Sequence, residues 1–254
     1  MLSLLLLVPV LSLFQAAATA QANVVTVSAA SDMEPVLQVI GPIFEQKTGL
    51  KLKVSFGSSA ALSQQLQNGS PADIFLSADF YFAEQLVTAN LTDTKQPTPY
   101  ADGVLVLWAR KDSRFKPLNI DVLARKDLKS VAVANGDRAP YGRAAYAVLK
   151  KMNFSANVAP HIVQAETVAQ AAQFALSGNA ELVLMSETIA MSAKYRNAGT
   201  YVLFPQSQYP DIRQCAVILK AGKNAQGAHR LLDFMLSEEV QTNLPKLGLR
   251  AAKQ

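Results

Sequence analysis

Short apolar runs alternate along the chain with longer segments in which apolar residues recur every three or four positions. The short runs are typical of buried strands, and the longer period is typical of helices that pack one face on a sheet. In the helix expected over 32–48, the apolar positions are Met33, Val36, Leu37, Ile40, Ile43 and Phe44. Gly49 follows them, and glycine commonly ends a helix. The pattern predicts an α/β fold.

Two series of alternating elements follow one another. In the first we expect strands at 24–28, 51–56, 73–77 and 103–109, with helices at 32–48, 59–68 and 79–89. In the second we expect strands at 130–134, 161–164, 181–185 and 200–204, with helices at 140–152, 167–178 and 187–195. A last strand over 212–220 and one or two helices within 225–244 do not complete a third domain, so this tail must pack on a lobe already built.

The simplest arrangement of these elements is two lobes with two crossings between them. Lobe 1 takes residues 21–104 and 206–254, and lobe 2 takes residues 105–205. Prolines flank both crossings, which suits boundary segments. Ligands of open α/β sheets bind beyond the carboxyl ends of the strands. Two lobes that face each other across a hinge are therefore expected to hold a ligand in the cleft between them.

The N-terminal segment predicts export. Residues 1–20 carry no charge, contain an apolar run too short to span a bilayer comfortably, and end on the small residues Ala18, Thr19 and Ala20. This pattern is typical of a secretory signal peptide, although no Lys or Arg precedes the leucines. We expect cleavage near Ala20 and a mature chain that begins near Gln21. An uncleaved membrane anchor is the alternative.

Composition narrows the classes of function. The net charge of +5 comes from scattered Lys and Arg and not from a basic stripe, which argues against nucleic-acid binding. Cys215 is the single cysteine, so an internal disulfide is excluded, and its apolar neighbours predict a buried thiol. His161 and His229 are far apart and have no Cys or carboxylate at ligand spacing, so we expect no transition-metal cation site.

Four predicted helix starts share a place in the fold, because each follows a strand and so lies at the carboxyl edge of a sheet. They are Ser31, Ser58-Ser59, Pro140-Tyr141 and Thr167-Val168. The first N–H groups of a helix have no partner inside it, so they are available to an anion. Ser31 with Glu34 fits a capping box. Any one of these starts is equally a plain helix cap, but the four together favour an anion site.

An anion held at these starts would meet helix dipoles, N–H groups and hydroxyls in place of Lys or Arg. Because burial removes the hydration of a dianion, the site must return a full set of hydrogen bonds. Arg138 and Arg143 flank the third start and suit either steering of anions or a solvated role. Asp73 and Asp79 are expected to be structural, with Asp79 as a helix cap, because two carboxylates would repel an anionic ligand.

Four runs carry a resemblance to a known family: Val27-Ser28-Ala29-Ala30-Ser31, Phe56-Gly57-Ser58-Ser59, Pro71-Ala72-Asp73-Ile74-Phe75-Leu76-Ser77-Ala78-Asp79 and Ala165-Glu166-Thr167-Val168. Across residues 24 to about 250, the chain resembles the periplasmic molybdate-binding proteins of ABC importers and, more broadly, the type II periplasmic binding proteins. The third run is the most specific. The resemblance implies two lobes, each a mixed, mostly parallel sheet flanked by helices, with the ligand cleft between them.

Position by position, the resemblance implies an oxyanion site. It implies that Ser31 and Ser59 donate hydroxyl and amide hydrogen bonds, and that Tyr141 and Val168 contribute backbone N–H groups. Ser58, which neighbours Ser59, is a secondary candidate.

Two further residues, Thr167 and Ser186, are candidates for the expected site. Thr167 is the other secondary candidate. Ser186, in Leu184-Met185-Ser186-Glu187, stands where the family carries a tyrosine hydroxyl, so the chain departs from the family there. We expect the phenol of Tyr141 to supply that donor from across the cleft.

The function that the resemblance implies is a non-enzymatic receptor with no cofactor and no catalytic residue. It would capture molybdate or tungstate in the periplasm as a monomer and deliver it to the membrane permease of an ABC importer. Closure of the lobes would bury the anion and present a surface that the permease distinguishes from the open form.

Other functions remain open at this point. A secreted serine hydrolase would use Ser31 or Ser59 as nucleophile, but the chain has no Gly-x-Ser-x-Gly elbow and no histidine in a fitting context. A receptor for sulfate or chromate shares every feature above, because anion size is not readable from spacing. The effector domain of a transcription regulator shares the fold, but the export signal and the lack of a helix-turn-helix segment weigh against it.

Overall fold

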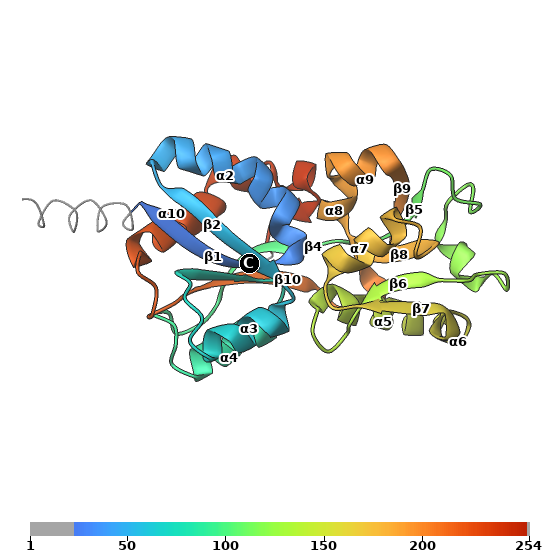
Figure 1. Ribbon diagram of the computed structural model, residues 1–254, viewed down its shortest axis with the longest axis horizontal. Coiled ribbons are helices and arrows are strands. Elements are labelled where there is room, and N and C mark those ends of the chain that lie inside the picture. Colours follow the sequence, from blue (N-terminus) through green and yellow to red (C-terminus); the bar gives the residue numbers. More distant parts are fainter. Residues whose placement is uncertain (1–22, 253–254) are drawn as a thin grey trace, which may run out of the picture.

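The computed structural model describes residues 23–252 and contains two lobes that lie side by side, each built on one sheet with helices packed against it (Figure 1). This confirms the expected two-lobed α/β fold. The predicted signal peptide, residues 1–20, lies outside the described residues. Within residues 23–252, the helices are too short or too polar to cross a membrane.

The sheet of the first lobe has the strand order β11-β4-β10-β3-β1-β2. Its strands are β1 (Val24–Ala30), β2 (Lys51–Gly57), β3 (Ile74–Ser77), β4 (Thr98–Gly103), β10 (Ile212–Ile218) and β11 (Leu249–Arg250). Strand β1 pairs in parallel with β2 and β3, whereas β10 runs antiparallel to β3 and β4. The end of the chain therefore completes the sheet that its beginning started.

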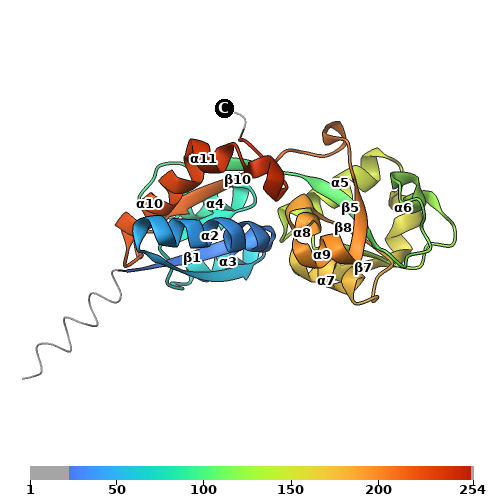
Figure 2. The ribbon, with the colours of Figure 1, turned by 90° about the horizontal axis from the view of Figure 1, so that it is seen from above.

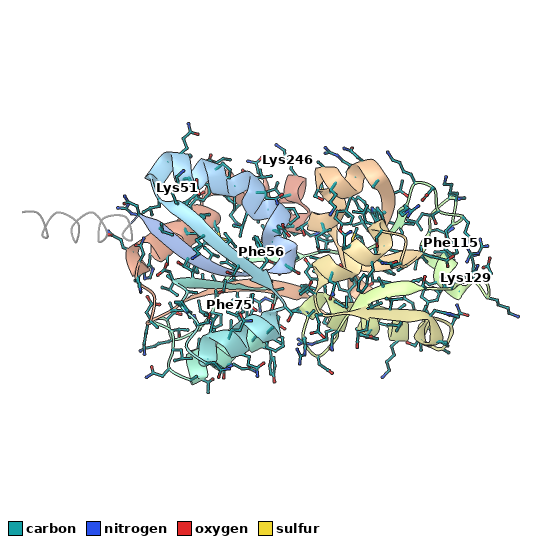
Figure 3. The ribbon with its side chains drawn as sticks, viewed as in Figure 1. Lys51, Phe56, Phe75, Phe115, Lys129 and Lys246 are labelled. Carbon is teal, nitrogen blue, oxygen red and sulfur yellow. The ribbon has the colours of Figure 1, made fainter. Side chains whose placement is uncertain are left out.

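Helices cover both faces of this sheet. On one face lie η1 (Ser31–Met33), α2 (Glu34–Thr48), α10 (Ala225–Leu236), α11 (Glu238–Gln241) and η5 (Leu244–Leu247). On the other face lie α3 (Ser59–Gln67) and α4 (Phe80–Thr88), which bury Phe75 of β3 (Figure 3). The predicted helix stop is confirmed, because Gly49 has a φ of 72° and its N–H donates to Glu45 O at 2.9 Å.

The sheet of the second lobe has the order β7-β6-β8-β5-β9. Its strands are β5 (Leu105–Arg110), β6 (Val131–Ala134), β7 (Ile162–Ala165), β8 (Leu182–Ser186) and β9 (Gly199–Leu203). The other elements of this half are η2 (Ile120–Ala124), α5 (Pro140–Lys151), α6 (Ser155–Val158), η3 (Ala159–His161), α7 (Val168–Leu176), α8 (Glu187–Met191) and α9 (Ala193–Ala198). Its core includes the fully buried Trp108 of β5 and the buried Phe115 of the loop after β5 (Figure 3).

Three details of the expected architecture are wrong. The sheets are not mostly parallel: β4, β10 and β11 pair antiparallel in the first, and β5 pairs antiparallel with both of its neighbours in the second. Strand β4 was not predicted, because its sequence TPYADG lacks the β-branched run on which a strand prediction rests. The helix expected over 187–195 divides into α8 and α9 at Ser192, whose backbone is extended with ψ at 149°.

The chain passes between the sheets at two places. Val104 is the residue between β4 and β5, and its carbonyl accepts a hydrogen bond from Glu187 N at 2.9 Å. The return runs from β9 through η4 (Gln206–Gln208) to β10, and the hydroxyl oxygen of Tyr209 on this segment accepts a hydrogen bond from Leu105 N at 3.1 Å. Figure 2 shows α10 and α11 beside β10 after this return.

Candidate functional site

All four predicted helix starts meet at one small cavity between the lobes, with an accessible volume of about 10 Å³. Its lining residues are Ala30, Ser31, Asp32, Gly57, Ser58, Ser59, Ala78, Ala139, Pro140, Tyr141 and Val168. These residues come from the ends of β1, β2 and β3 in one lobe and from the starts of α5 and α7 in the other. The expected convergence of carboxyl strand ends is therefore observed.

Two buried serine hydroxyls in this cavity are held by backbone amides. Ser31 Oγ accepts from Ala169 N at 3.4 Å, across the gap between the lobes, and Ser59 Oγ accepts from Ala78 N at 3.1 Å. Each oxygen is thereby fixed in place while its own hydrogen stays available as a donor. Such a pair of hydroxyls suits an anion that presents oxygen acceptors.

The local structure at the two serines differs from the predicted caps. Ser31 is not the cap of a capping box: it begins the 3₁₀ turn η1, with Ala30 as its N-cap and no side-chain cap bond. The preceding backbone stays extended through Ala30, so Ser31 itself enters the turn and its hydroxyl is free to face the other lobe. Ser58 does cap α3, accepting from Ala61 N at 3.3 Å.

The second lobe presents two helix N-termini. Pro140 is the first residue of α5, as expected, so the N–H of Tyr141 belongs to the first turn and has no acceptor inside the helix. Val168 is the first residue of α7, so its N–H also belongs to a first helical turn. Gly142 lets α5 approach this closely, because a Cβ there would lie 2.3 Å from the carbonyl oxygen of Ala134.

Two of the predicted site residues are not part of the cavity lining. Ser186 is fully buried and caps α8, where its Oγ accepts from Ile189 N at 3.4 Å and lies 2.9 Å from Thr188 Oγ1. Thr167 caps α7 by accepting from Gln170 N at 3.0 Å. Both side chains cap their own helices, and neither lines the cavity.

The phenol of Tyr141 also differs from the expectation, because it is engaged in a buried polar cluster behind the cavity. Its oxygen lies 3.3 Å from Gln214 Nε2, and it hydrogen-bonds to the Asp32 carboxyl. Gln214 donates to Asp32 Oδ2 at 2.5 Å and accepts from the hydroxyl of Tyr100 at 2.8 Å. The phenol thus joins the lobes and does not stand in for the donor that Ser186 lacks.

Asp32, Gln214 and Tyr100 were missed by reasoning from the sequence. Asp32 and Gln214 are separated by 182 positions, so no local pattern links them. Burial raises the pKa of the Asp32 carboxyl from 3.8 to about 6, against the opposing effect of hydrogen bonds from Gln214 and Tyr141. Burial also raises the pKa of Tyr100 and Tyr141 well above 10, so both phenols stay protonated. The one available signal was an acidic residue directly beside Ser31.

Cationic side chains surround the cavity without lining it. Arg143 of α5 pairs with Asp79 across the lobes, with Nη1 2.8 Å from Oδ2, while Asp79 also caps α4 by accepting from Phe82 N. Arg138 pairs with Glu166 at 3.2 Å, and its carbonyl accepts from Ala60 N at 3.2 Å. These interlobe contacts show that the two lobes are closed on one another.

The other residues considered from the sequence have structural roles or form no site among the described residues. Asp73 accepts from Thr26 N and Asn224 N at 2.6 and 2.7 Å, which confirms its structural role. Cys215 is buried, as predicted. Among residues 23–252 no group of three His, Cys, Asp or Glu side chains is placed to hold a metal ion. A wider groove at the start of β1 has Lys53 and Lys223 in its lining and receives no helix start.

Comparison with known proteins gives concordant results. Residues 25–250 match the model of a family described as bacterial extracellular solute-binding protein. The chain is 35% identical over 223 residues to the molybdate-binding protein ModA of Azotobacter vinelandii, covering 86% of each chain, and 32% identical to that of Rhodobacter capsulatus, covering 90% of this chain and 88% of the relative. The solved periplasmic molybdate-binding protein of Azotobacter vinelandii superposes with a TM-score of 0.81 at 27% identity, covering 90% of this chain and all of that one.

Proposed function

Because this chain belongs to the bacterial extracellular solute-binding protein family, we propose that it is a non-enzymatic receptor for the tetrahedral oxyanions molybdate and tungstate. It delivers the anion to the membrane permease of an ABC importer. The relatives from Azotobacter vinelandii and Rhodobacter capsulatus are named molybdate-binding proteins, and their matches cover most of the chain. The receptor acts as a monomer and uses no cofactor.

One observation carries this proposal: helix starts from both lobes converge on one small interlobe cavity whose lining contains no lysine or arginine. The donors that face it are the hydroxyls of Ser31 and Ser59 and the first-turn N–H groups at Tyr141 and Val168. Neutral, rigid donors replace the hydrogen bonds that a buried dianion loses with its hydration, and their fixed positions make binding selective for its size and shape.

Closure of the lobes completes the site. Donors come from residues 21–104 on one side and from residues 105–205 on the other, with residues 206–254 returning to lobe 1. The hinge lies at Val104 and in the segment between β9 and β10. An anion that contacts both lobes stabilises the closed form relative to the open form. The permease then distinguishes the closed receptor from the open one.

The receptor works in the periplasm. Residues 1–20 have the composition of a signal peptide, cleaved near Ala20. The solved relative from Azotobacter vinelandii is named as a periplasmic protein.

A serine hydrolase fits the structure less well. His229 pairs with Asp93 at 3.0 Å on the exposed surface, and neither His229 nor His161 lines the cavity. Replacing both histidines with alanine separates the classes, since a receptor keeps its affinity and a hydrolase loses turnover.

Calorimetric titration with molybdate, tungstate, chromate and sulfate tests the proposal. We expect molybdate and tungstate to bind at micromolar concentrations or tighter. If none of the four anions binds tighter than millimolar, the receptor function is wrong. If sulfate competes as well as molybdate does, the oxyanion receptor stands and only the named ligand is wrong.

A further inference from the structure

A carboxyl group lies directly behind a cavity that the proposed function fills with a dianion. Asp32 lines the cavity beside Ser31, and only 1% of its surface is exposed. Its carboxyl is held by Gln214 Nε2 at 2.5 Å and by the phenol of Tyr141. Its carbonyl accepts from Thr188 Oγ1 of the other lobe at 2.7 Å.

The groups that face Asp32 are neutral or acidic. Tyr141 of α5 and Gln214 of β10 contact the carboxyl, and Tyr100 of β4 reaches it through Gln214. Of the elements packed on η1, α2 carries Glu34 and α8 carries Glu187, which are not among the groups that interact with the Asp32 carboxyl, and α7 carries no charged residue. Among the described residues, no lysine or arginine pairs with Asp32, since Arg143 and Arg138 are paired with Asp79 and Glu166.

A dianion and an ionised Asp32 would therefore share one buried region without a cation to separate them. Like charges in such a setting raise the pKa of the group that is able to take up a proton. Serine hydroxyls and backbone amides do not accept that proton, and the phenols of Tyr100 and Tyr141 are already protonated.

We propose that oxyanion binding is coupled to protonation of Asp32, so that the closed receptor carries its anion together with one proton on the Asp32 carboxyl. The inference rests on the proposed oxyanion function. The proton comes from solvent when the lobes close and forms an O–H bond on the carboxylate. It returns to solvent when the lobes open, because opening withdraws Tyr141 and Thr188 and admits water to Asp32. Deprotonation then favours release of the anion.

The coupling fixes the direction of the pH dependence. In the closed, ligand-free structure the pKa of Asp32 is about 6, and opening lowers it because water reaches the carboxyl. Above about pH 6 the ligand-free protein is therefore ionised at this position and must bind a proton to bind the anion. The dissociation constant then rises about tenfold per pH unit, until the pH passes the still higher pKa of the complex. Below about pH 5 the carboxyl is already neutral in the free protein, and this dependence disappears.

Calorimetric titration with molybdate, in buffers of different ionisation enthalpy at about pH 5 and about pH 8, counts the protons directly. We expect uptake of close to one proton per anion at the higher pH and close to none at the lower pH. Asp32→Asn keeps the size of the side chain and removes the charge, so it is expected to abolish both the uptake and the pH slope. The anion is common to both proteins, so its own titration cancels in the comparison.

Glu187→Gln is the matched control, because Glu187 is a half-buried carboxyl with a raised pKa that does not line the cavity. It is expected to leave the proton count unchanged. Tight binding by the unmodified protein at about pH 8 without proton uptake would overturn this inference and leave the oxyanion function intact. Failure to bind any oxyanion would overturn both. The number of protons that the unmodified protein takes up per anion tests the inference even if Asp32→Asn does not fold.

Discussion

Two serine hydroxyls carry much of the proposed anion contact, and they are prepared for it differently. Ser59 is positioned within its own lobe by Ala78 N, whereas Ser31 takes its hydrogen bond from Ala169 on the opposite lobe. Ser59 is therefore set before the lobes meet, and Ser31 is set as they meet.

Replacing Ser59 with alanine removes one donor to a charged ligand. We expect the affinity for molybdate to fall by about 1–3 kcal/mol, which is roughly 5- to 150-fold. Ser63→Ala is the matched control on the same helix, because Ser63 Oγ donates to Phe82 O at 2.9 Å and does not line the cavity. Titration of both variants checks this, and unchanged affinity in Ser59→Ala would contradict the site. Ser31→Ala is expected to lose a similar amount.

Asp32 also affects the stability of the ligand-free protein. Its folded-state pKa of about 6 lies above the 3.8 of an unfolded chain, so the folded state loses stability as pH rises from about 4 to about 6, and the full loss persists above that. Asp32→Asn removes a penalty of up to about 3 kcal/mol at pH 8. Denaturant unfolding at pH 8 and below pH 4 measures it. A variant less stable than the unmodified protein at pH 8 would contradict this reading.

The four helix starts show how much of the site could be predicted from the local sequence. Strands β1, β2, β6 and β7 and the helices after them were predicted to within a few residues, because each has its own periodicity and flanking signal. Sheet directions were predicted less well, since nothing local in β10 shows that it pairs antiparallel with β3. The cluster of Asp32, Gln214 and Tyr141 was not predictable, because it depends on contacts between distant parts of the chain.

A substitution at Thr167 distinguishes two roles of its side chain, as a helix cap and as a ligand contact. Because its Oγ1 accepts from Gln170 N and does not line the cavity, Thr167→Ala is expected to lower stability by about 1 kcal/mol and to leave affinity nearly unchanged. Unfolding and titration of the same preparation measure both quantities. A loss of affinity above tenfold with unchanged stability would show that Thr167 contacts the anion.

The two lobes form one receptor only if they reach the closed position seen here. Gly103 ends β4 at the crossing, and a Cβ at this position would lie 2.3 Å from the Tyr141 hydroxyl and 3.1 Å from Ile212 Cγ2. The hydroxyl has little freedom to move, because it is buried among Asp32 and Gln214. The absence of a side chain at Gly103 is therefore part of the closing geometry.

Gly103→Ala is expected to hold the lobes apart and to lower the affinity for molybdate at least tenfold. Small-angle scattering should show a smaller decrease in the radius of gyration on addition of ligand than in the unmodified protein. Adding Tyr141→Phe removes the oxygen at 2.3 Å but leaves the ring carbon Cζ at 2.9 Å, so it should restore only part of the affinity. If Gly103→Ala closes and binds normally, the lobes do not require this close approach.

The position of the anion is the central claim, and a crystal structure of the protein grown with molybdate tests it most directly. The account predicts a molybdenum peak in the cavity between the lobes, with anion oxygens within hydrogen-bond distance of Ser31 Oγ, Ser59 Oγ and the N–H groups of Tyr141 and Val168. A molybdenum peak elsewhere, such as the groove with Lys53 and Lys223 in its lining, with the interlobe cavity empty, would contradict it.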